Sequence, residues 1–221
     1  MTQQIIPNNL IILLSGVPCV GKTTTAYNII KNYPVFKRVA EVDLIKTILR
    51  TVLNESKNGN TEFFEKYNFL LSSSTDISFL SLKEQAHALS KYVIEIIKRQ
   101  QTRKIPTVIE GLGIVPSVYF LESEIIDTLN NNVMFINLYI SNEEEHIKRR
   151  LMRCAERKYQ NDVNQLKEKI YKYREKNIQM HNETLELSKK YKNVFSIDIS
   201  YMTEDEVIEK IIQLISLSTE N

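Results

Sequence analysis

The sequence predicts an α/β fold in which a parallel sheet is covered by helices on both faces. Short apolar runs alternate with longer stretches of helical periodicity, and the first run, LIILLS at residues 10–15, is apolar throughout. Strands that are buried on both faces of a parallel sheet have this continuous apolar character. Strand–helix alternation is typical of sheets whose crossovers are helices. Ligands of such sheets bind beyond the carboxyl ends of the strands, so the residues after each strand are the candidates for a site.

The periodicity predicts the individual elements. Strands are expected over residues 10–15, 38–42, 105–110, 133–140 and 194–199. Helices are expected over residues 22–32, 44–53, 62–71, 82–103, 121–130, 162–191 and 204–215. Another helix is expected to open at Ser141, because Glu144 follows at the spacing of a capping box. Pro106 is expected as the first residue of its strand, where it removes no ladder hydrogen bond.

Size and composition bound the class of protein. A chain of 221 residues is long enough for one domain with an inserted segment, and we expect a single domain over residues 1–221. The 29 basic and 27 acidic residues nearly balance, which argues against a nucleic-acid coat but leaves room for a local basic patch. Two cysteines outside any CxxC pair predict a reduced, cytoplasmic protein without a metal framework. The run at residues 10–15 is too short to span a membrane.

A phosphate-binding motif follows the first strand. GVPCVGKT, residues 16–23, matches G-x-x-x-x-G-K-[ST] between a strand and a helix, which is the P-loop of nucleoside triphosphatases. Glycines let backbone N–H groups curl around a phosphate, and the following helix adds its positive end. Lys22 is expected to reach the β- and γ-phosphates, Thr23 to bind Mg²⁺ and Thr24 to touch the α-phosphate. The predicted nucleotide-binding residues are Gly16, Val17, Pro18, Cys19, Val20, Gly21, Lys22, Thr23 and Thr24.

Two alternatives accompany this motif. One is a chance match, which the flanking strand and helix and the scarcity of glycine in this chain argue against. The other concerns Cys19, which either fills space in the loop or acts as a redox switch.

A second group of polar residues follows the second strand in RVAEVDLIKTILR. Asp43 comes directly after the strand, and Lys46 and Arg50 stand three and seven residues further on, so all three share one helix face. A carboxylate there can accept or orient the proton of a substrate hydroxyl, and the two cations can hold an anionic substrate. The alternative is that Asp43 only caps the helix.

The third strand ends in VIEGLG, which holds two of the chain's five glycines. Glu110 is predicted to hold the Mg²⁺ shell or polarise a water, and Gly111 and Gly113 to let the backbone approach a substrate. The alternative is that both glycines only make a tight turn.

A basic helix is predicted after the fourth strand. HIKRRLMRCAERK, residues 146–158, carries six Lys or Arg, and Arg149, Arg153 and Arg157 recur every four residues beside Arg150. A lid over residues 142–175 could close this stripe on a triphosphate, with Arg149 and Arg153 stabilising the transferred charge and Arg157 binding nucleotide. The alternative is a solvated basic face.

These residues together resemble one enzyme family. The P-loop, VDLIKTILR, SSST, VIEGLGIVP and REKNIQ are similar to the kinase portion of 2-phosphoglycerate kinase and related small-molecule kinases, over roughly residues 10–200. The resemblance implies sheet order 2-3-1-4-5, Mg-ATP as donor, and acceptor and metal contacts at Asp43, Arg50 and Glu110. A helical insertion on the substrate side is expected over about residues 54–103. Two positions depart from the family pattern: Gly113 stands in place of a histidine, and Lys46 in place of an arginine. The identity of the phosphate acceptor is therefore left open.

The sequence therefore predicts an ATP-dependent kinase acting on a hydroxyl of a small, anionic metabolite. A kinase of 5′-hydroxyl polynucleotides or sugar nucleotides is a second reading, which a basic groove near Asp43 would favour. A nucleotide-dependent binding switch is a third, and the set Asp43, Lys46 and Arg50 argues against it.

Overall fold

The structure is a computed structural model that describes residues 6–56, 79–120, 132–156 and 163–219. Its sheet has five parallel strands in the order β2-β3-β1-β4-β5, as expected. The strands are β1 (Ile11–Ser15), β2 (Arg38–Glu41), β3 (Thr107–Glu110), β4 (Val133–Tyr139) and β5 (Val194–Asp198). All five carboxyl ends meet along one edge, which is where the predicted site residues follow the strands.

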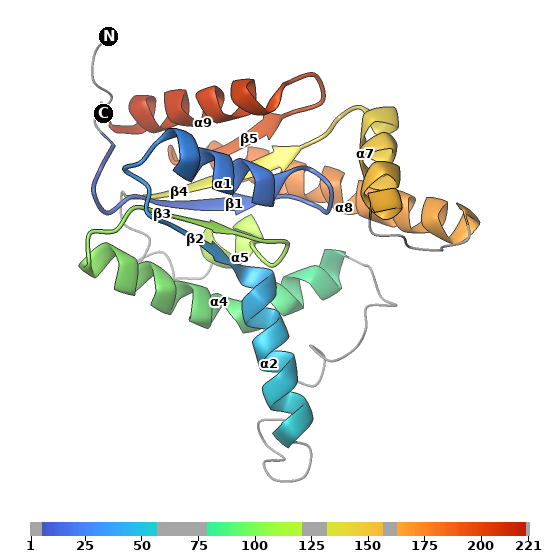
Figure 1. The fold of residues 1–221 in the computed structure, drawn as a ribbon, viewed down its shortest axis with the longest axis horizontal. Coiled ribbons are helices and arrows are strands. Elements are labelled where there is room, and N and C mark those ends of the chain that lie inside the picture. The colour runs from blue at the N-terminus through green and yellow to red at the C-terminus, as the bar shows by residue number, and fades with distance from the viewer. Residues whose placement is uncertain (1–5, 57–78, 121–131, 157–162, 220–221) are drawn as a thin grey trace.

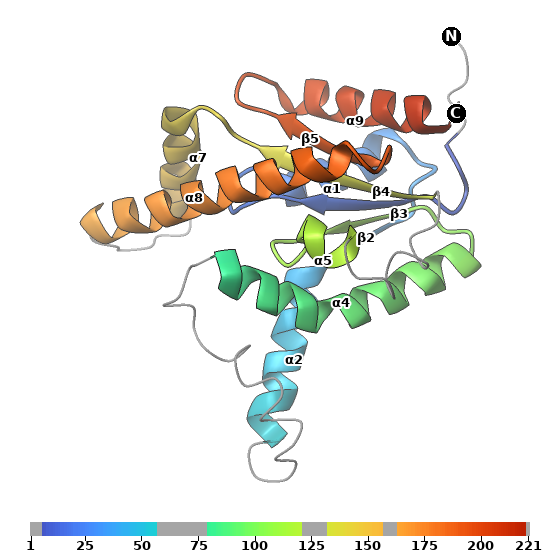
Figure 2. The same cartoon turned by 180° about the vertical axis from the view of Figure 1, so that it is seen from behind.

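Helices cover both faces of the sheet (Figures 1 and 2). α1 (Lys22–Asn32) and α9 (Glu204–Thr219) lie on one face, and α4 (Phe79–Thr102), α5 (Pro116–Phe120) and α8 (Val163–Ser188) on the other. The central strand β1 supplies both cores, because Ile11 and Leu13 pack on the α4 side while Ile12 and Leu14 pack on the α1 side. Burial on both faces explains the unbroken apolar run that predicted this strand.

Two helices stand apart from these layers. α2 (Val42–Ser56) projects away from the sheet, and α7 (Glu143–Glu156) stands at the carboxyl edge beside α8 (Figure 1). α2 follows β2 directly, and α7 follows β4 after a short connection. None of the described helices combines the length and apolar character needed to cross a membrane.

The start of α2 differs from the prediction. The strand ends at Glu41 and the helix begins at Val42, so Asp43 is the second helical residue rather than its N-cap. Val42 was expected in the strand because it is apolar, but it is buried against α4 and the β3–α5 turn.

Other boundaries also needed correction. The third strand begins at Thr107, so Pro106 precedes it. Asn142, not Ser141, caps α7, since its Oδ1 accepts a hydrogen bond from the Glu145 N–H at 3.1 Å. The Ser141 N–H is bonded instead to Ser200 and Asp198. The short helix α5 was not predicted, and the expected helices at 62–71 and 121–130 lie outside the described residues.

Candidate active site

The P-loop curls between β1 and α1. Gly16 has a φ of 140° and Gly21 a φ of 84°, conformations that glycine adopts without strain. A Cβ at Gly16 would come within 2.6 Å of the Leu138 carbonyl oxygen, so this position tolerates glycine alone. Cys19 adopts a φ of 71° at the centre of the loop although it is not a glycine. The two glycines of the motif are therefore required by the path of the backbone.

Lys22 is the first residue of α1 and is only 8% exposed. Its Nζ donates a hydrogen bond to the Val17 carbonyl at 3.1 Å, across the loop. Burial lowers the pKa of Lys22, and the nearby carboxylates Glu110 and Asp43 act against that shift. The ammonium is thus held inside the loop with few partners, ready to interact with an anion.

Thr23 and Glu110 meet at the ends of α1 and β3. The Thr23 hydroxyl donates to Glu110 Oε1 at 2.8 Å. Glu110 is buried, and burial raises the pKa of its carboxyl group, while the Thr23 hydrogen bond and Lys22 oppose the rise. The two residues that the sequence proposed as metal ligands therefore lie together. Within the described part of the chain, no group of three or more His, Cys, Asp or Glu side chains is placed to bind a metal.

A hydrogen bond between α1 and β2 joins two residues that the sequence analysis did not single out. Tyr27, one turn after Thr23 on α1, donates from its hydroxyl to Glu41 Oε1 at 2.9 Å. Glu41 pairs in register with Glu110 on the neighbouring strand, and both contribute to the raised pKa of Tyr27, with Glu41 dominant. No motif signals this contact, because it joins a helix surface to a strand end.

Asp43, Lys46 and Arg50 share one face of α2. Asp43 is exposed in the first turn of α2, and its negative charge raises the pKa of both Lys22 and Glu110. The half-buried Lys46 donates to Gln85 Oε1 on α4. Burial lowers the pKa of Lys46, Arg50 lowers it further, and Asp43 opposes them. The predicted acceptor residues are therefore neighbours of one another.

Gly111 and Gly113 have a packing reason for being glycine. Neither has a positive φ. A Cβ on Gly111 would lie 2.8 Å from the Val42 Cβ, and one on Gly113 would lie 3.0 Å from Leu89 Cδ1. Both glycines let the β3–α5 turn pass close under α2 and α4. Their role in substrate binding stays a prediction.

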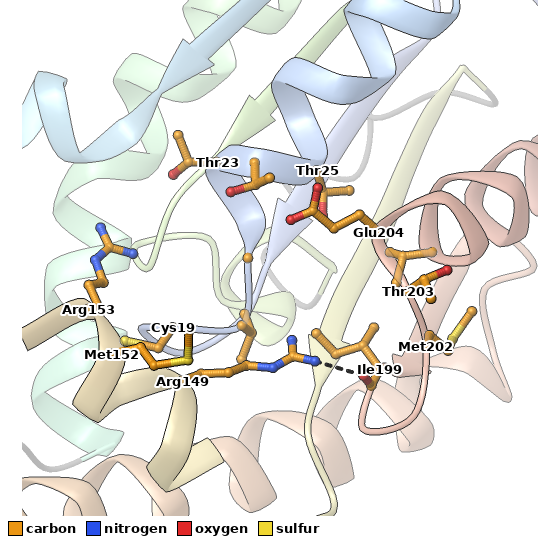
Figure 3. Close-up of a pocket in the computed structure, with 14 residues that line it drawn as sticks. Cys19, Thr23, Thr25, Arg149, Met152, Arg153, Ile199, Met202, Thr203 and Glu204 are labelled. Carbon is orange, nitrogen blue, oxygen red and sulfur yellow. Dashed lines mark hydrogen bonds between the residues drawn. The ribbon is translucent and has the colours of Figure 1, made fainter. Parts of the chain in front are cut away.

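A pocket of about 660 Å³ opens between the P-loop, α7 and the loop after β5 (Figure 3). Arg149 and Arg153 reach it from α7, as the predicted stripe required, and Arg149 also donates to Glu145 at 2.8 Å. Arg150 does not line the pocket itself; its guanidinium lies over the Tyr173 ring, with Nη1 4.0 Å from the sulfur of the lining residue Cys19. Arg157 lies outside the described residues. The other lining residues include Cys19, Val20, Gly21, Thr23, Thr24, Met152, Met202, Thr203, Glu204 and Val207.

The sequence analysis did not predict the side of this pocket that is formed by the residues after β5. Asp198, at the end of β5, accepts hydrogen bonds from the Ser200 hydroxyl at 2.6 Å and from the Ser141 N–H at 3.2 Å. These contacts tie the exits of β4 and β5 together and fix the loop that carries Met202 and Thr203. No phosphate or metal motif marks this loop.

Comparisons with known proteins agree with this geometry. No family model matches the chain. It is 23% identical over 152 residues to 2-phosphoglycerate kinase of Methanothermobacter thermautotrophicus, which covers 66% of this chain and 48% of that protein. The chain thus spans about half the length of the curated relative it matches. This match confirms the resemblance that the motifs indicated.

Two solved structures share the architecture. Gluconokinase from Sinorhizobium meliloti 1021 has a TM-score of 0.55 and 13% identity, covering 97% of this chain and 96% of its own. Thymidylate kinase from Candida albicans has a TM-score of 0.50 and 15% identity, covering 95% and 92%. This chain shares its fold with these two proteins, a P-loop α/β fold with sheet order β2-β3-β1-β4-β5. The expected fold class is therefore confirmed.

Proposed function

We propose that the protein is an ATP-dependent kinase that transfers the γ-phosphoryl group to a hydroxyl of a small, anionic metabolite, for example an acid like 2-phosphoglycerate. The observation that carries this proposal is the Thr23–Glu110 hydrogen bond at the P-loop, and the charge of Asp43 on α2 acts on both Lys22 and Glu110. A phosphate-binding loop alone fits many nucleotide-binding proteins. A carboxylate and two cations on the opposite side of that loop are what a phosphoryl acceptor needs.

Lys22 and the loop amides bind the donor phosphates. The Lys22 ammonium is bonded to the Val17 carbonyl, a weak partner for a buried charge. A phosphate oxygen is a stronger, charged acceptor, so Lys22 exchanges the carbonyl for the β- and γ-phosphates. Arg149 and Arg153 neutralise further charge from the α7 side, within the lid proposed for residues 142–175.

Thr23 and Glu110 fit a magnesium ion. A hydroxyl and one carboxylate are a suitable protein contribution for Mg²⁺, which takes its remaining ligands from phosphates and water. The burial that raises the Glu110 pKa is offset when a cation lies beside the carboxylate. Bound there, the ion would neutralise charge that develops on the β- and γ-phosphates.

Asp43 orients the acceptor hydroxyl and receives its proton. The hydroxyl oxygen forms a bond to the γ-phosphorus as the bond to the β-phosphate oxygen breaks, which yields ADP and a phosphate ester. The proton passes from the hydroxyl to the Asp43 carboxylate and then to water. Lys46 and Arg50 hold an anionic group of the acceptor one and two turns along α2.

The remainder of the pocket is suited to the nucleoside. Met152, Met202 and Val207 supply apolar surface, and Thr203 and Arg149 supply polar groups around it. A planar base fits a site of this kind, which is apolar with a few polar groups that fix orientation.

The test is a phosphoryl-transfer assay with the purified protein. Mg-ATP is incubated with a panel of hydroxy acids, phospho acids, sugar acids, nucleosides and 5′-hydroxyl oligonucleotides, and mass spectrometry detects any product heavier by one phosphoryl group. Lys22→Ala serves as the negative control, because it removes the charge that binds the phosphates while leaving the fold.

The outcomes separate the alternatives. A phosphorylated small acid supports the proposal and identifies the acceptor. A phosphorylated oligonucleotide or nucleoside would show that the acceptor belongs to that class instead. If Lys22→Ala turned over as fast as the unaltered protein, the proposed mechanism would be wrong. Hydrolysis of ATP without transfer to any acceptor would favour a nucleotide-dependent switch.

A further inference from the structure

His146 joins helix α7 to the P-loop. It lies in the first turn of α7, is 1% exposed, and places its Nε2 3.1 Å from the carbonyl oxygen of Pro18, 128 positions earlier. A carbonyl can only accept a hydrogen bond, so Nε2 carries the proton and donates. Nδ1 then holds a lone pair, and among the described residues it has no hydrogen-bond partner. The contact to Pro18 is therefore the polar contact that fixes the imidazole.

The contact controls the orientation of one peptide of the loop. The Pro18 carbonyl and the Cys19 N–H belong to the same peptide unit, and no described peptide bond is cis. In a trans peptide the C=O and N–H point in opposite directions, so a carbonyl held by His146 directs the Cys19 N–H away from the imidazole. Cys19 lines the nucleotide pocket. Its N–H is thus one of the amides available to a phosphate.

Cys19 needs such support because of its backbone conformation. Its φ of 71° lies in the left-handed region, which costs a non-glycine residue about 1–2 kcal/mol. Residues persist in that region when surrounding contacts hold them there. The His146 hydrogen bond acts on the peptide that precedes Cys19, and Arg150 Nη1 lies 4.0 Å from its Sγ. Both contacts come from the first two turns of α7.

These turns of α7 are in turn fixed by α8. The Arg150 guanidinium lies 4.4 Å from the centre of the Tyr173 ring, and Arg174 pairs with Glu143 at 3.0 Å. Burial lowers the pKa of the His146 imidazole most, and the positive charges of Arg150, Arg174 and Arg149 lower it further. The hydrogen bond to the Pro18 carbonyl acts in the opposite direction. A neutral donor is therefore favoured at this position over a cationic one.

We propose that His146 is a positioning residue for nucleotide binding: it donates from Nε2 to Pro18 and so turns the Cys19 N–H toward the phosphates and sets the arginines of α7 against the loop. The proposal rests on the nucleotide-binding half of the proposed function and names a residue that touches neither substrate. His146 acts through the loop, so its substitution should affect Mg-ATP and not the acceptor.

The first experiment measures binding of Mg-ATP by calorimetry, without any acceptor. His146→Leu should weaken binding by about tenfold, the effect of one lost hydrogen bond near a charged group. His146→Gln, whose side-chain amide can donate from a similar position, should stay within about threefold of the unaltered protein. His87→Leu is the matched control, since His87 is exposed on α4 and does not line the pocket.

Three results would overturn the role of His146. They are unaltered binding by His146→Leu, equal loss in the Leu and Gln variants, and a loss that His87→Leu shares. Failure of the proposed function is distinguishable, because then the unaltered protein does not bind Mg-ATP or Lys22→Ala binds it equally well. Once an acceptor is known, a change in its KM as large as that for ATP would also contradict the proposal.

A second measurement uses the unaltered protein and decides even where His146→Leu does not fold. Nitrogen-15 NMR of the three histidine side chains, assigned with the Gln variant, reports the tautomer of each ring. His146 should be neutral and protonated on Nε2 at pH 7, with and without Mg-ATP. A neutral ring protonated on Nδ1 would overturn the proposal, because its Nε2 could not donate to the Pro18 carbonyl.

Discussion

The Thr23 hydroxyl and the Glu110 carboxylate are joined by a 2.8 Å hydrogen bond although they stand 87 positions apart. Local sequence places Thr23, whereas long-range strand pairing places Glu110. Thr23 is set by the turn from P-loop to α1, and Glu110 by its register with Leu14 on β1. Their meeting supports the magnesium site proposed beside the phosphate-binding loop.

The first prediction concerns pH and stability. Burial raises the pKa of Glu110, so the folded protein keeps this proton at pH values where the unfolded chain has released it. Stability from this group is present below the ordinary glutamate pKa and is lost as pH rises through the raised value. Glu110→Gln should therefore be more stable than the unaltered protein at neutral pH, by on the order of 1 kcal/mol, and the advantage should shrink toward acid pH.

Urea unfolding at several pH values between 4 and 7 would measure this difference. Glu95→Gln is a suitable control, because Glu95 is exposed on α4, where its carboxylate pairs with Lys98 at 3.0 Å. A difference between Glu110→Gln and the unaltered protein that is constant with pH would contradict the prediction. The same variant should also need a higher Mg²⁺ concentration for half-maximal turnover, as it lacks a ligand charge.

Lys22→Met is expected to separate stability from function. Burial lowers the pKa of Lys22, so the charged ammonium destabilises the fold at neutral pH. The variant should melt about 2–4 °C higher, the shift expected for about 1 kcal/mol in a chain of this size. Its affinity for Mg-ATP should fall by at least about tenfold.

Melting curves with and without Mg-ATP test both halves of this prediction. The gain in melting temperature should be largest below the lowered pKa of Lys22 and should decrease as pH rises through that pKa, because the folded unaltered protein then loses its buried charge. A variant that melts lower than the unaltered protein at every pH would show that Lys22 contributes packing or hydrogen bonding that outweighs its desolvation.

The sequence predicted what is encoded locally. Strand order along the chain, the P-loop and the arginine spacing of α7 follow from apolar period and motif, and the structure reproduces them. The start of α2 was not predictable in this way, because Val42 is apolar for a long-range reason, its packing under the Gly111 turn. Periodicity cannot distinguish a buried strand end from a buried first residue of a helix.

The parts of the site that were missed share one property, which is that they arise between segments. The Tyr27–Glu41 hydrogen bond joins α1 to β2, and the His146–Pro18 contact joins α7 to the P-loop. The pocket wall around Met202 follows a strand without a motif. Sequence order alone does not show which surfaces face each other, so only the folded structure could bring these residues to notice.

Lys46 should govern affinity for the acceptor. It is half-buried and lies between Asp43 and Arg50 on the face proposed for an anionic substrate. Lys46→Met should raise the acceptor KM by about tenfold, as expected for loss of one charge-assisted hydrogen bond, and leave the KM for ATP unchanged. Lys98→Met, at an exposed position on α4, is the matched control.

Steady-state kinetics with the acceptor found in the panel assay would measure these constants. An equal rise in both KM values would indicate that Lys46 supports the fold through Gln85 rather than the substrate. An unchanged acceptor KM would remove Lys46 from the acceptor site.

Alanine at Gly111 and Gly113 distinguishes packing from substrate approach. The Gly111 Cβ would meet the Cβ of Val42 at 2.8 Å, a contact that only a backbone shift relieves, whereas the Gly113 Cβ would meet the end of the Leu89 side chain at 3.0 Å and Val42 Cγ1 at 3.3 Å. Gly111→Ala should therefore lower the free energy of unfolding by about 1–3 kcal/mol, the range for overpacking, and Gly113→Ala by less. If these glycines serve substrate approach instead, both variants would keep their stability in urea and raise the acceptor KM. Measuring unfolding and KM on the same two variants decides between the two roles, because a loss of stability confined to Gly111→Ala with unchanged KM can only come from packing under α2.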